Sequence, residues 1–146
     1  MPKTRLSAAL ALVLVATAAA QTVAAQAQAA AETTVQPDLA ELLWVARPLV
    51  VFADSPQDPR YVQQMELLAA GSDTLDDFRV QVLTDTDPTA MGPLRHALRP
   101  RGFGLVLIDT DGSVVQRRPT VTSVREIAGT IDRLPSRRQE TGSRRQ

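Results

Sequence analysis

The side chains that could carry out chemistry in this sequence are few, and they exclude thiol chemistry. The chain has 146 residues and no cysteine. Disulfide exchange needs a thiolate that attacks a sulfur atom, and thiol-based reduction of peroxides needs the same nucleophile. The sequence therefore excludes both activities for this chain.

Nucleophilic hydrolysis and metal catalysis are also poorly supplied. His96 is the only histidine, and no G-x-S-x-G motif places a serine for attack. A zinc site needs several nitrogen or sulfur ligands. The segments Asp85–Asp87 and Asp109–Gly112 have the oxygen ligands of calcium loops but lack the bidentate glutamate that completes an EF-hand. We interpret both as turns and expect neither a metal nor a cofactor.

One loop combines polar side chains with a predicted helix start. We take it as the candidate binding loop, and its candidate residues are Asp54, Ser55, Gln57, Asp58 and Arg60. Asp58 is suited to cap the helix, and Pro59 to occupy its first position. A helix N-terminus favours anions, and Arg60 would add positive charge, whereas Asp58 would occupy the same amides. An anion site and a simple helix cap both stay open.

Charge is distributed unevenly along the chain, and the C-terminal end is basic. Residues 32–94 hold eleven acidic residues and three arginines, whereas residues 95–146 hold eleven arginines and five acidic residues. Arg137 and Arg138 are therefore candidate contacts to an anionic partner. Residues 136–146 are predicted to form a flexible, arginine-rich tail. Two alternatives stay open: the tail is simply solvated, or Arg137 packs against the acidic half of the same chain.

The first 31 residues have the pattern of a secretory signal peptide. Two cations, Lys3 and Arg5, precede the apolar run Leu6–Ala20, and an Ala/Gln-rich stretch follows it. Gln21 ends the run before it reaches the length of a membrane-spanning helix. We expect an exported protein, periplasmic or secreted, without stable membrane insertion after cleavage. Its partner would be an envelope or extracellular protein rather than nucleic acid, since aromatic side chains for base stacking are scarce. The oligomeric state is not predicted.

The hydrophobic pattern predicts one α/β domain over residues 32–135. Helices are expected from Leu39 to Ala46, from Asp58 to Gly71, from Thr89 to Leu98 and from Ser123 to Leu134. Strands are expected over residues 49–53, 78–83 and 103–108, with a fourth strand after the turn at Asp111-Gly112. Two β-α-β units would make the first three strands parallel, and the hairpin would add one antiparallel strand. The predicted fold is a mixed four-stranded sheet with helices on both faces.

This order of elements resembles thioredoxin. The tetrad Gln57-Asp58-Pro59-Arg60 lies where thioredoxin has Cys-Gly-Pro-Cys, so the proline is kept and both thiols are missing. Gly104 lies at the position of the active-site cis-proline.

Over Leu42–Arg138 the chain more specifically resembles the P-DUDES family of thioredoxin- or peroxiredoxin-like domains. The resemblance rests on Leu43-Trp44, on Arg47–Phe52 followed by Asp58-Pro59-Arg60, on Gly102-Phe103, on Asp109–Gly112, and on the ending Ile131–Glu140. It implies a thioredoxin-like fold and an exported protein, but it implies no activity.

Two functions are consistent with the sequence. The first is a non-catalytic, thioredoxin-like binding module that engages an envelope or extracellular component. The alternative is an enzyme with thiol-independent chemistry at the loop Asp54–Arg60, for which Arg60→Ala would remove function and leave the melting temperature nearly unchanged.

Overall fold

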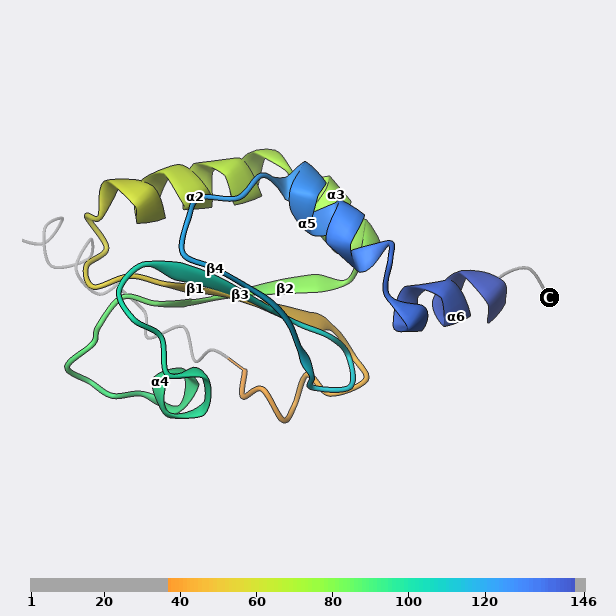
Figure 1. The fold of residues 1–146 in the computed structure, drawn as a ribbon, viewed down its shortest axis with the longest axis horizontal. Coiled ribbons are helices and arrows are strands. Elements are labelled where there is room, and N and C mark those ends of the chain that lie inside the picture. Colours follow the sequence, from red (N-terminus) through yellow and green to blue (C-terminus); the bar gives the residue numbers. More distant parts are fainter. Residues whose placement is uncertain (1–36, 144–146) are drawn as a thin grey trace, which may run out of the picture. The chain divides into compact units, whose positions relative to one another are not determined.

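The computed structural model describes residues 37–143 (Figure 1). The predicted signal peptide, residues 1–31, lies outside the described residues. The strands are β1 (Arg47–Phe52), β2 (Val80–Asp85), β3 (Gly104–Ile108) and β4 (Val114–Arg118). The helices are α2 (Pro59–Ala70), α3 (Ser72–Asp77), α4 (Pro93–Leu98), α5 (Val124–Ile131) and α6 (Pro135–Ser143).

The strands form one mixed four-stranded sheet in the order β2-β1-β3-β4. β1 and β2 are parallel and are joined by a crossover through α2 and α3. β3 runs antiparallel to β1, and β4 runs antiparallel to β3. The prediction of a mixed four-stranded sheet is confirmed, but the prediction of three parallel strands is wrong, because only β1 and β2 pair in parallel.

The connection between β2 and β3 accounts for this error. It covers residues 86–103, contains the six-residue helix α4, and does not carry the chain back along the sheet. It starts at the end of β2 and leads into β3 at the same end of the sheet, where Gly104 pairs with Phe52.

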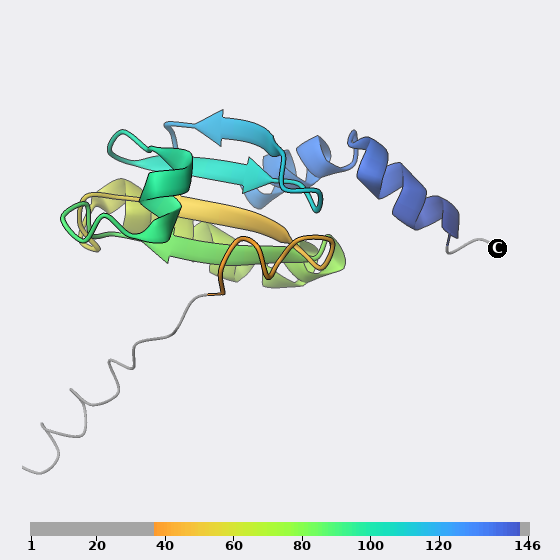
Figure 2. The same cartoon turned by 90° about the horizontal axis from the view of Figure 1, so that it is seen from below.

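Helices cover both faces of the sheet (Figures 1 and 2). Leu49 and Val51 of β1 point to the face covered by α2, α3 and α5, where Leu68, Leu75 and Ile127 are buried. Val50 and Phe52, the alternate residues of β1, point to the other face. There they pack with Leu98 of α4 and with Leu42, which precedes β1. Because β1 is buried on both faces, all six of its residues are buried, as its continuous apolar pattern indicated.

The helix signals read from the sequence correspond to real caps. Asp58 caps α2 with Pro59 as the first helical residue, and Gly71 ends the helix. Ser123 and Glu126 form a reciprocal capping box at the start of α5. These predictions are confirmed because each depends only on residues within one turn of the helix end.

Several elements differ from the prediction. Residues 39–45 form successive hydrogen-bonded turns in place of a regular helix, and Trp44 takes a left-handed φ of 63°. The acidic segment Ser72–Asp77, for which no element was predicted, forms the short helix α3. The helix predicted from Thr89 begins only at Pro93. Residues 136–143 of the expected flexible tail belong to helix α6, which begins at Pro135.

Candidate functional site

The candidate binding loop follows β1 at the end of the sheet where the parallel strands β1 and β2 also end. The hydroxyl of Ser55 accepts a hydrogen bond from the Gln57 amide over 3.1 Å, and the Asp58 amide donates to the Ser55 carbonyl over 3.2 Å. The side chains of Ser55 and Gln57 are also hydrogen-bonded to each other. The polar groups of this turn are therefore directed largely at one another.

Asp58 and Arg60 form a closed pair at the start of α2. Asp58 Oδ1 accepts from the Arg60 amide over 2.9 Å, and Asp58 Oδ2 lies 3.0 Å from an Arg60 guanidinium nitrogen. The hydrogen bond from the Arg60 side chain, followed by that from its amide, lowers the pKa of Asp58 below its ordinary value. A carboxylate of the protein itself thus occupies the helix N-terminus where an external anion would bind.

The rest of the loop faces the segment before β3. Arg60 lies over the ring of Phe103, with its guanidinium carbon 5.0 Å from the ring centroid. A β-carbon placed on Gly102 would lie 3.6 Å from a carboxylate oxygen of Asp54. The loop after β1 and the segment before β3 therefore lie side by side.

Arg95 of α4 supports this end of the sheet from the opposite face. Its Nε donates to Asp85 Oδ1 over 2.8 Å, and another of its nitrogens donates to the Ala53 carbonyl over 2.7 Å. Its guanidinium lies 5.6 Å from the ring centroid of Phe52. Arg95 joins the ends of β1 and β2 and so fixes the backbone from which the candidate binding loop starts.

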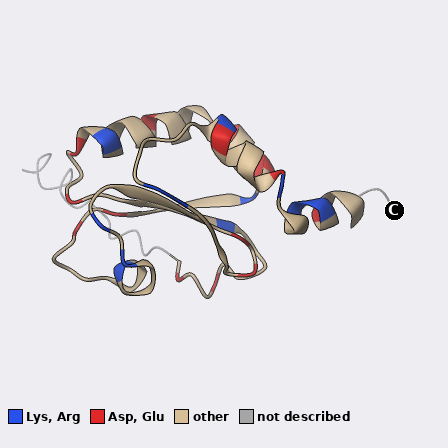
Figure 3. Ribbon diagram, in the orientation of Figure 1, with Lys and Arg blue, Asp and Glu red and all other residues tan. Residues whose placement is uncertain are grey.

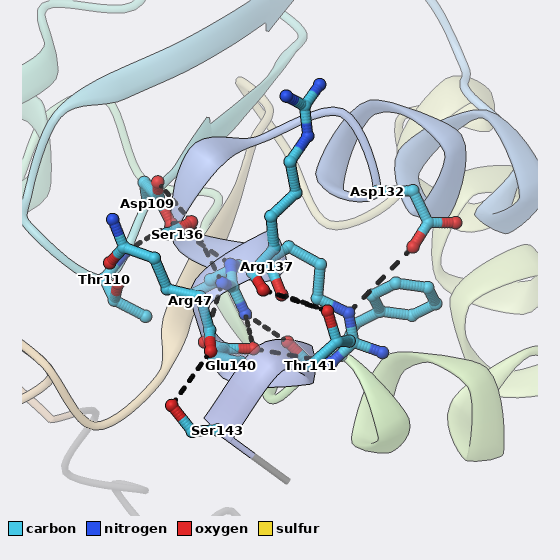
Figure 4. A network of polar contacts seen from close by, with 12 residues as sticks. Arg47, Asp109, Thr110, Asp132, Ser136, Arg137, Glu140, Thr141 and Ser143 are labelled. Carbon is cyan, nitrogen blue, oxygen red and sulfur yellow. Dashed lines mark hydrogen bonds and ion pairs between the residues drawn. The ribbon is translucent and has the colours of Figure 1, made fainter. Parts of the chain in front are cut away.

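A buried polar network lies at the opposite end of β1 (Figure 4). Arg47 is fully buried, and its Nε donates to Asp109 Oδ1 over 3.1 Å. Other guanidinium nitrogens donate to the Phe78 carbonyl over 3.0 Å and to Glu140 Oε1 over 2.8 Å. Ser136 of α6 accepts from Arg47 and donates to Asp109. The network attaches α6 to the sheet.

The two basic candidates in α6 are in different surroundings. Arg137 stacks over Phe78, 4.5 Å from the ring centroid, and pairs with Glu140 over 3.4 Å and with Asp132 over 3.9 Å. Arg138 is exposed. Arg137 thus makes intramolecular contacts, one of the alternatives drawn from the sequence, although its acidic partners come from the C-terminal half of the chain.

Sequence reasoning missed Arg47, Asp109 and Glu140 as a group. Two signals were available. One charged residue, Arg47, begins a buried strand, and another, Asp109, directly follows a second buried strand. They indicate a pair only if the two strands run antiparallel, because only then do Arg47 and Asp109 lie at the same end of the sheet.

Glu140 gives the network a dependence on pH. Partial burial tends to raise the pKa of Glu140, but its hydrogen bond and charge interaction with Arg47, together with Arg137, outweigh burial and lower the pKa below its ordinary value of 4.5. A lowered pKa in the folded state means that the stabilisation is complete above about pH 4.5 and is lost as the pH falls through the folded-state pKa. We therefore predict that Glu140→Gln lowers the free energy of unfolding at pH 7 and that its difference from the wild type shrinks as the pH falls below about 4.5.

Urea denaturation across this pH range measures that difference. Glu66→Gln, at an exposed position of α2, removes the same charge without touching the network and should follow the wild type. A difference at Glu140 that stays constant with pH would contradict the assignment.

The described part of the chain lacks two further kinds of site. Within residues 37–143, no group of three or more His, Cys, Asp or Glu side chains is placed to hold a metal ion. No helix in that range is long and apolar enough to cross a membrane.

Two solved structures of similar fold are peroxiredoxins. The reduced 2-Cys peroxiredoxin of Plasmodium vivax is 14% identical, with a TM-score of 0.57 over 69% of this chain and 84% of that one. Plasmodium yoelii Prx1a is 16% identical, with a TM-score of 0.53 over 69% of this chain and 80% of that one. These similarities establish a thioredoxin-like fold.

Sequence comparison adds a family. No curated protein matches the chain. The family model described as a domain of unknown function, DUF4174, matches residues 38–140. That range spans the sheet, the candidate binding loop and the network around Arg47. The chain belongs to the DUF4174 family.

Proposed function

We propose that this protein is an exported binding module with a thioredoxin-like fold, which holds its ligand at the end of the sheet where β1 and β2 end and does not convert it. The observation that carries the proposal is the pairing of Asp58 with Arg60. At the place where the fold would present a nucleophile to a helix N-terminus, this chain has a carboxylate that accepts from the Arg60 amide over 2.9 Å and pairs with the Arg60 side chain over 3.0 Å.

The chemistry available at this end of the sheet supports binding over turnover. The sequence supplies no thiol, and the hydroxyl of Ser55 is hydrogen-bonded to Gln57. A serine nucleophile needs an adjacent general base. Ligands of open α/β sheets bind at the carboxyl ends of parallel strands, which is where the ends of β1 and β2 and the start of β3 meet. The export proposed here rests on the signal-peptide pattern of residues 1–31.

The alternative, a thiol-independent enzyme at Asp54–Arg60, makes a different prediction. A ligand screen by thermal shift, followed by amide NMR titration, should find a ligand that raises the melting temperature and shifts the amides of residues 54–60 and 99–104. For a binding module, mass spectrometry recovers that ligand unchanged after prolonged incubation. Recovery of a converted product would instead indicate an enzyme. If Arg60→Ala abolishes that conversion and leaves the melting temperature of the protein unchanged, the enzyme is established and the proposal is overturned.

A further inference from the structure

We propose that a cleft beside the candidate binding loop binds a phosphate-ester group, carried either by a free organic phosphate or by a phospholipid head group. The cleft has a volume of about 250 Å³. We call it the arginine cleft, because its lining includes Arg99, Arg101, Arg117 and Arg118. The inference rests on the proposed function and deepens it, since it names the chemistry of the ligand.

Two separate segments supply the four arginines of the lining, and Arg117 and Arg118, adjacent on β4, extend to opposite faces of the sheet. Arg99 ends α4 in the left-handed conformation, with φ 47°, and Arg101 follows in the loop before β3. Arg117 and Arg118 end β4, where they pair with Val106 and Leu105 of β3. Because β3 and β4 are antiparallel, the start of one strand and the end of the other share one end of the sheet. Figure 3 shows these basic segments in the loop after α4 and along β4.

The positive charge of the arginine cleft is not neutralised by ion pairs of the protein. Of the ion pairs formed within residues 37–143, none involves any of the four arginines, whereas Arg47, Arg60, Arg95 and Arg137 all have acidic partners. Arg117 donates to the Leu98 carbonyl over 2.7 Å, which holds its guanidinium in place without neutralising it.

Two carboxylates near the cleft already interact with other groups of the protein. Glu126 belongs to the capping box of α5, and its pKa is lowered mainly by hydrogen bonds from Ser123 and least by the charge of Arg118. Asp54 lies beside Gly102 and interacts with the charge of Arg60. No acidic residue lines the cleft itself.

Two features of the cleft favour a phosphate ester over a single carboxylate as its ligand. They are the number of guanidinium groups and the apolar wall. A carboxylate pairs bidentately with one guanidinium, whereas a phosphate monoester carries a charge of about −1.5 to −2 and three acceptor oxygens that several guanidinium groups can share. The buried side chains of Phe52, Phe103 and Val106 form part of the wall. An apolar wall weakens the screening of charge and strengthens attraction of an anion. The small volume limits the ligand to about the size of a head group.

The experiment titrates the protein with sodium pyrophosphate and follows binding by calorimetry, with 31P NMR of the same sample. Saturable binding by the wild type is expected, and Arg99→Gln/Arg101→Gln should weaken it about tenfold or more. The matched control is Arg125→Gln/Arg133→Gln, which removes the same charge from exposed positions on and just after α5 and should leave the affinity within about twofold. Citrate, a polycarboxylate, should bind more weakly than pyrophosphate.

A second arm uses vesicles of phosphatidylcholine with and without phosphatidic acid. Binding only to phosphatidic acid vesicles, lost in Arg99→Gln/Arg101→Gln, identifies a lipid head group as the source of the phosphate ester. Binding only to pyrophosphate identifies a free phosphate compound, and not a lipid surface, as the source of the phosphate group. The inference is overturned if neither probe binds, if both double variants weaken binding equally, or if citrate binds more tightly than pyrophosphate.

Failure of this inference and failure of the proposed function give different results. If the arginine cleft is inert but the ligand screen finds an unconverted ligand that shifts residues 54–60, the binding module stands without this site. If pyrophosphate binds and 31P NMR shows its conversion to inorganic phosphate, the site stands and the non-catalytic function is wrong.

Discussion

Replacing Arg47 with methionine is expected to lower the free energy of unfolding by about 3–5 kcal/mol, the range for removing one partner of a buried ion pair. Arg47 is 0% exposed, and its guanidinium lies between Asp109 and Glu140. Methionine fills much of the volume but leaves Asp109 without a cation and Glu140 with Arg137 alone. The carbonyl of Phe78 and the hydroxyl of Ser136 also lose their donor. Urea denaturation at pH 7 measures the loss.

Two further variants separate the charge effect from packing. Arg125→Met, at an exposed position of α5, should change stability by less than about 0.5 kcal/mol. The neutral combination Arg47→Met/Asp109→Asn/Glu140→Gln should recover much of the loss, because it leaves no unpaired buried charge. A loss below about 1 kcal/mol for Arg47→Met alone would show that water reaches the network and that α6 is not held by it.

The second large effect is expected at Gln64, where alanine should lower the free energy of unfolding by about 3 kcal/mol. Gln64 lies fully buried in α2. Its amide nitrogen donates to the Thr122 carbonyl over 2.9 Å, and its oxygen accepts from the Thr122 amide over 2.8 Å. Alanine leaves both backbone groups of Thr122, itself 4% exposed, without these partners and also creates a cavity. Each unsatisfied buried group costs about 1–3 kcal/mol.

The neighbouring residue provides the control for this site. Gln63→Ala changes the same side chain at an exposed position of α2 and should stay within about 0.5 kcal/mol of the wild type. Thermal and urea denaturation of both variants test the assignment. Equal stability of the two would mean that the segment before α5 does not depend on Gln64 for its attachment to α2.

The network around Arg47 gives a physical reason for the unusual sequence at the end of the domain. A helix end alone does not require the run Leu134–Glu140, with its two arginines and glutamate. In the structure, Ser136 and Glu140 bind Arg47, and Arg137 covers Phe78. Residues that looked like a polar tail are therefore the polar side of an intramolecular interface. Arg138, which stays exposed, is the member of this run that remains available to an anionic partner.

The candidate binding loop was predictable in its position and partly in its geometry. Asp58, Pro59 and Gly71 mark the ends of α2 in the sequence, and the structure has all three in those roles. The sequence left open whether Asp58 or an external anion occupies the helix N-terminus. Its pairing with Arg60 is local, between residues two positions apart, and supports the cap. The arginine cleft was not predictable in the same way, because Arg99 and Arg117 become neighbours only through the β3–β4 hairpin.

The sequence by itself determined the local features of this protein: the lack of thiol chemistry, the caps of α2 and α5, the buried strand β1 and the hairpin between β3 and β4. Each depends on residue types within a few positions of one another. Only the tertiary structure decided the direction of β3, because the connection over residues 86–103 is long enough to lead to either end of the sheet. That direction brings Asp109 beside Arg47, and Phe78 and Asp109 together form the surface to which α6 binds. The polar segment Pro135–Ser143 has no apolar stripe from which its helix could be predicted. Its structure depends on Arg47, Phe78 and Asp109, which lie more than 25 residues away in sequence.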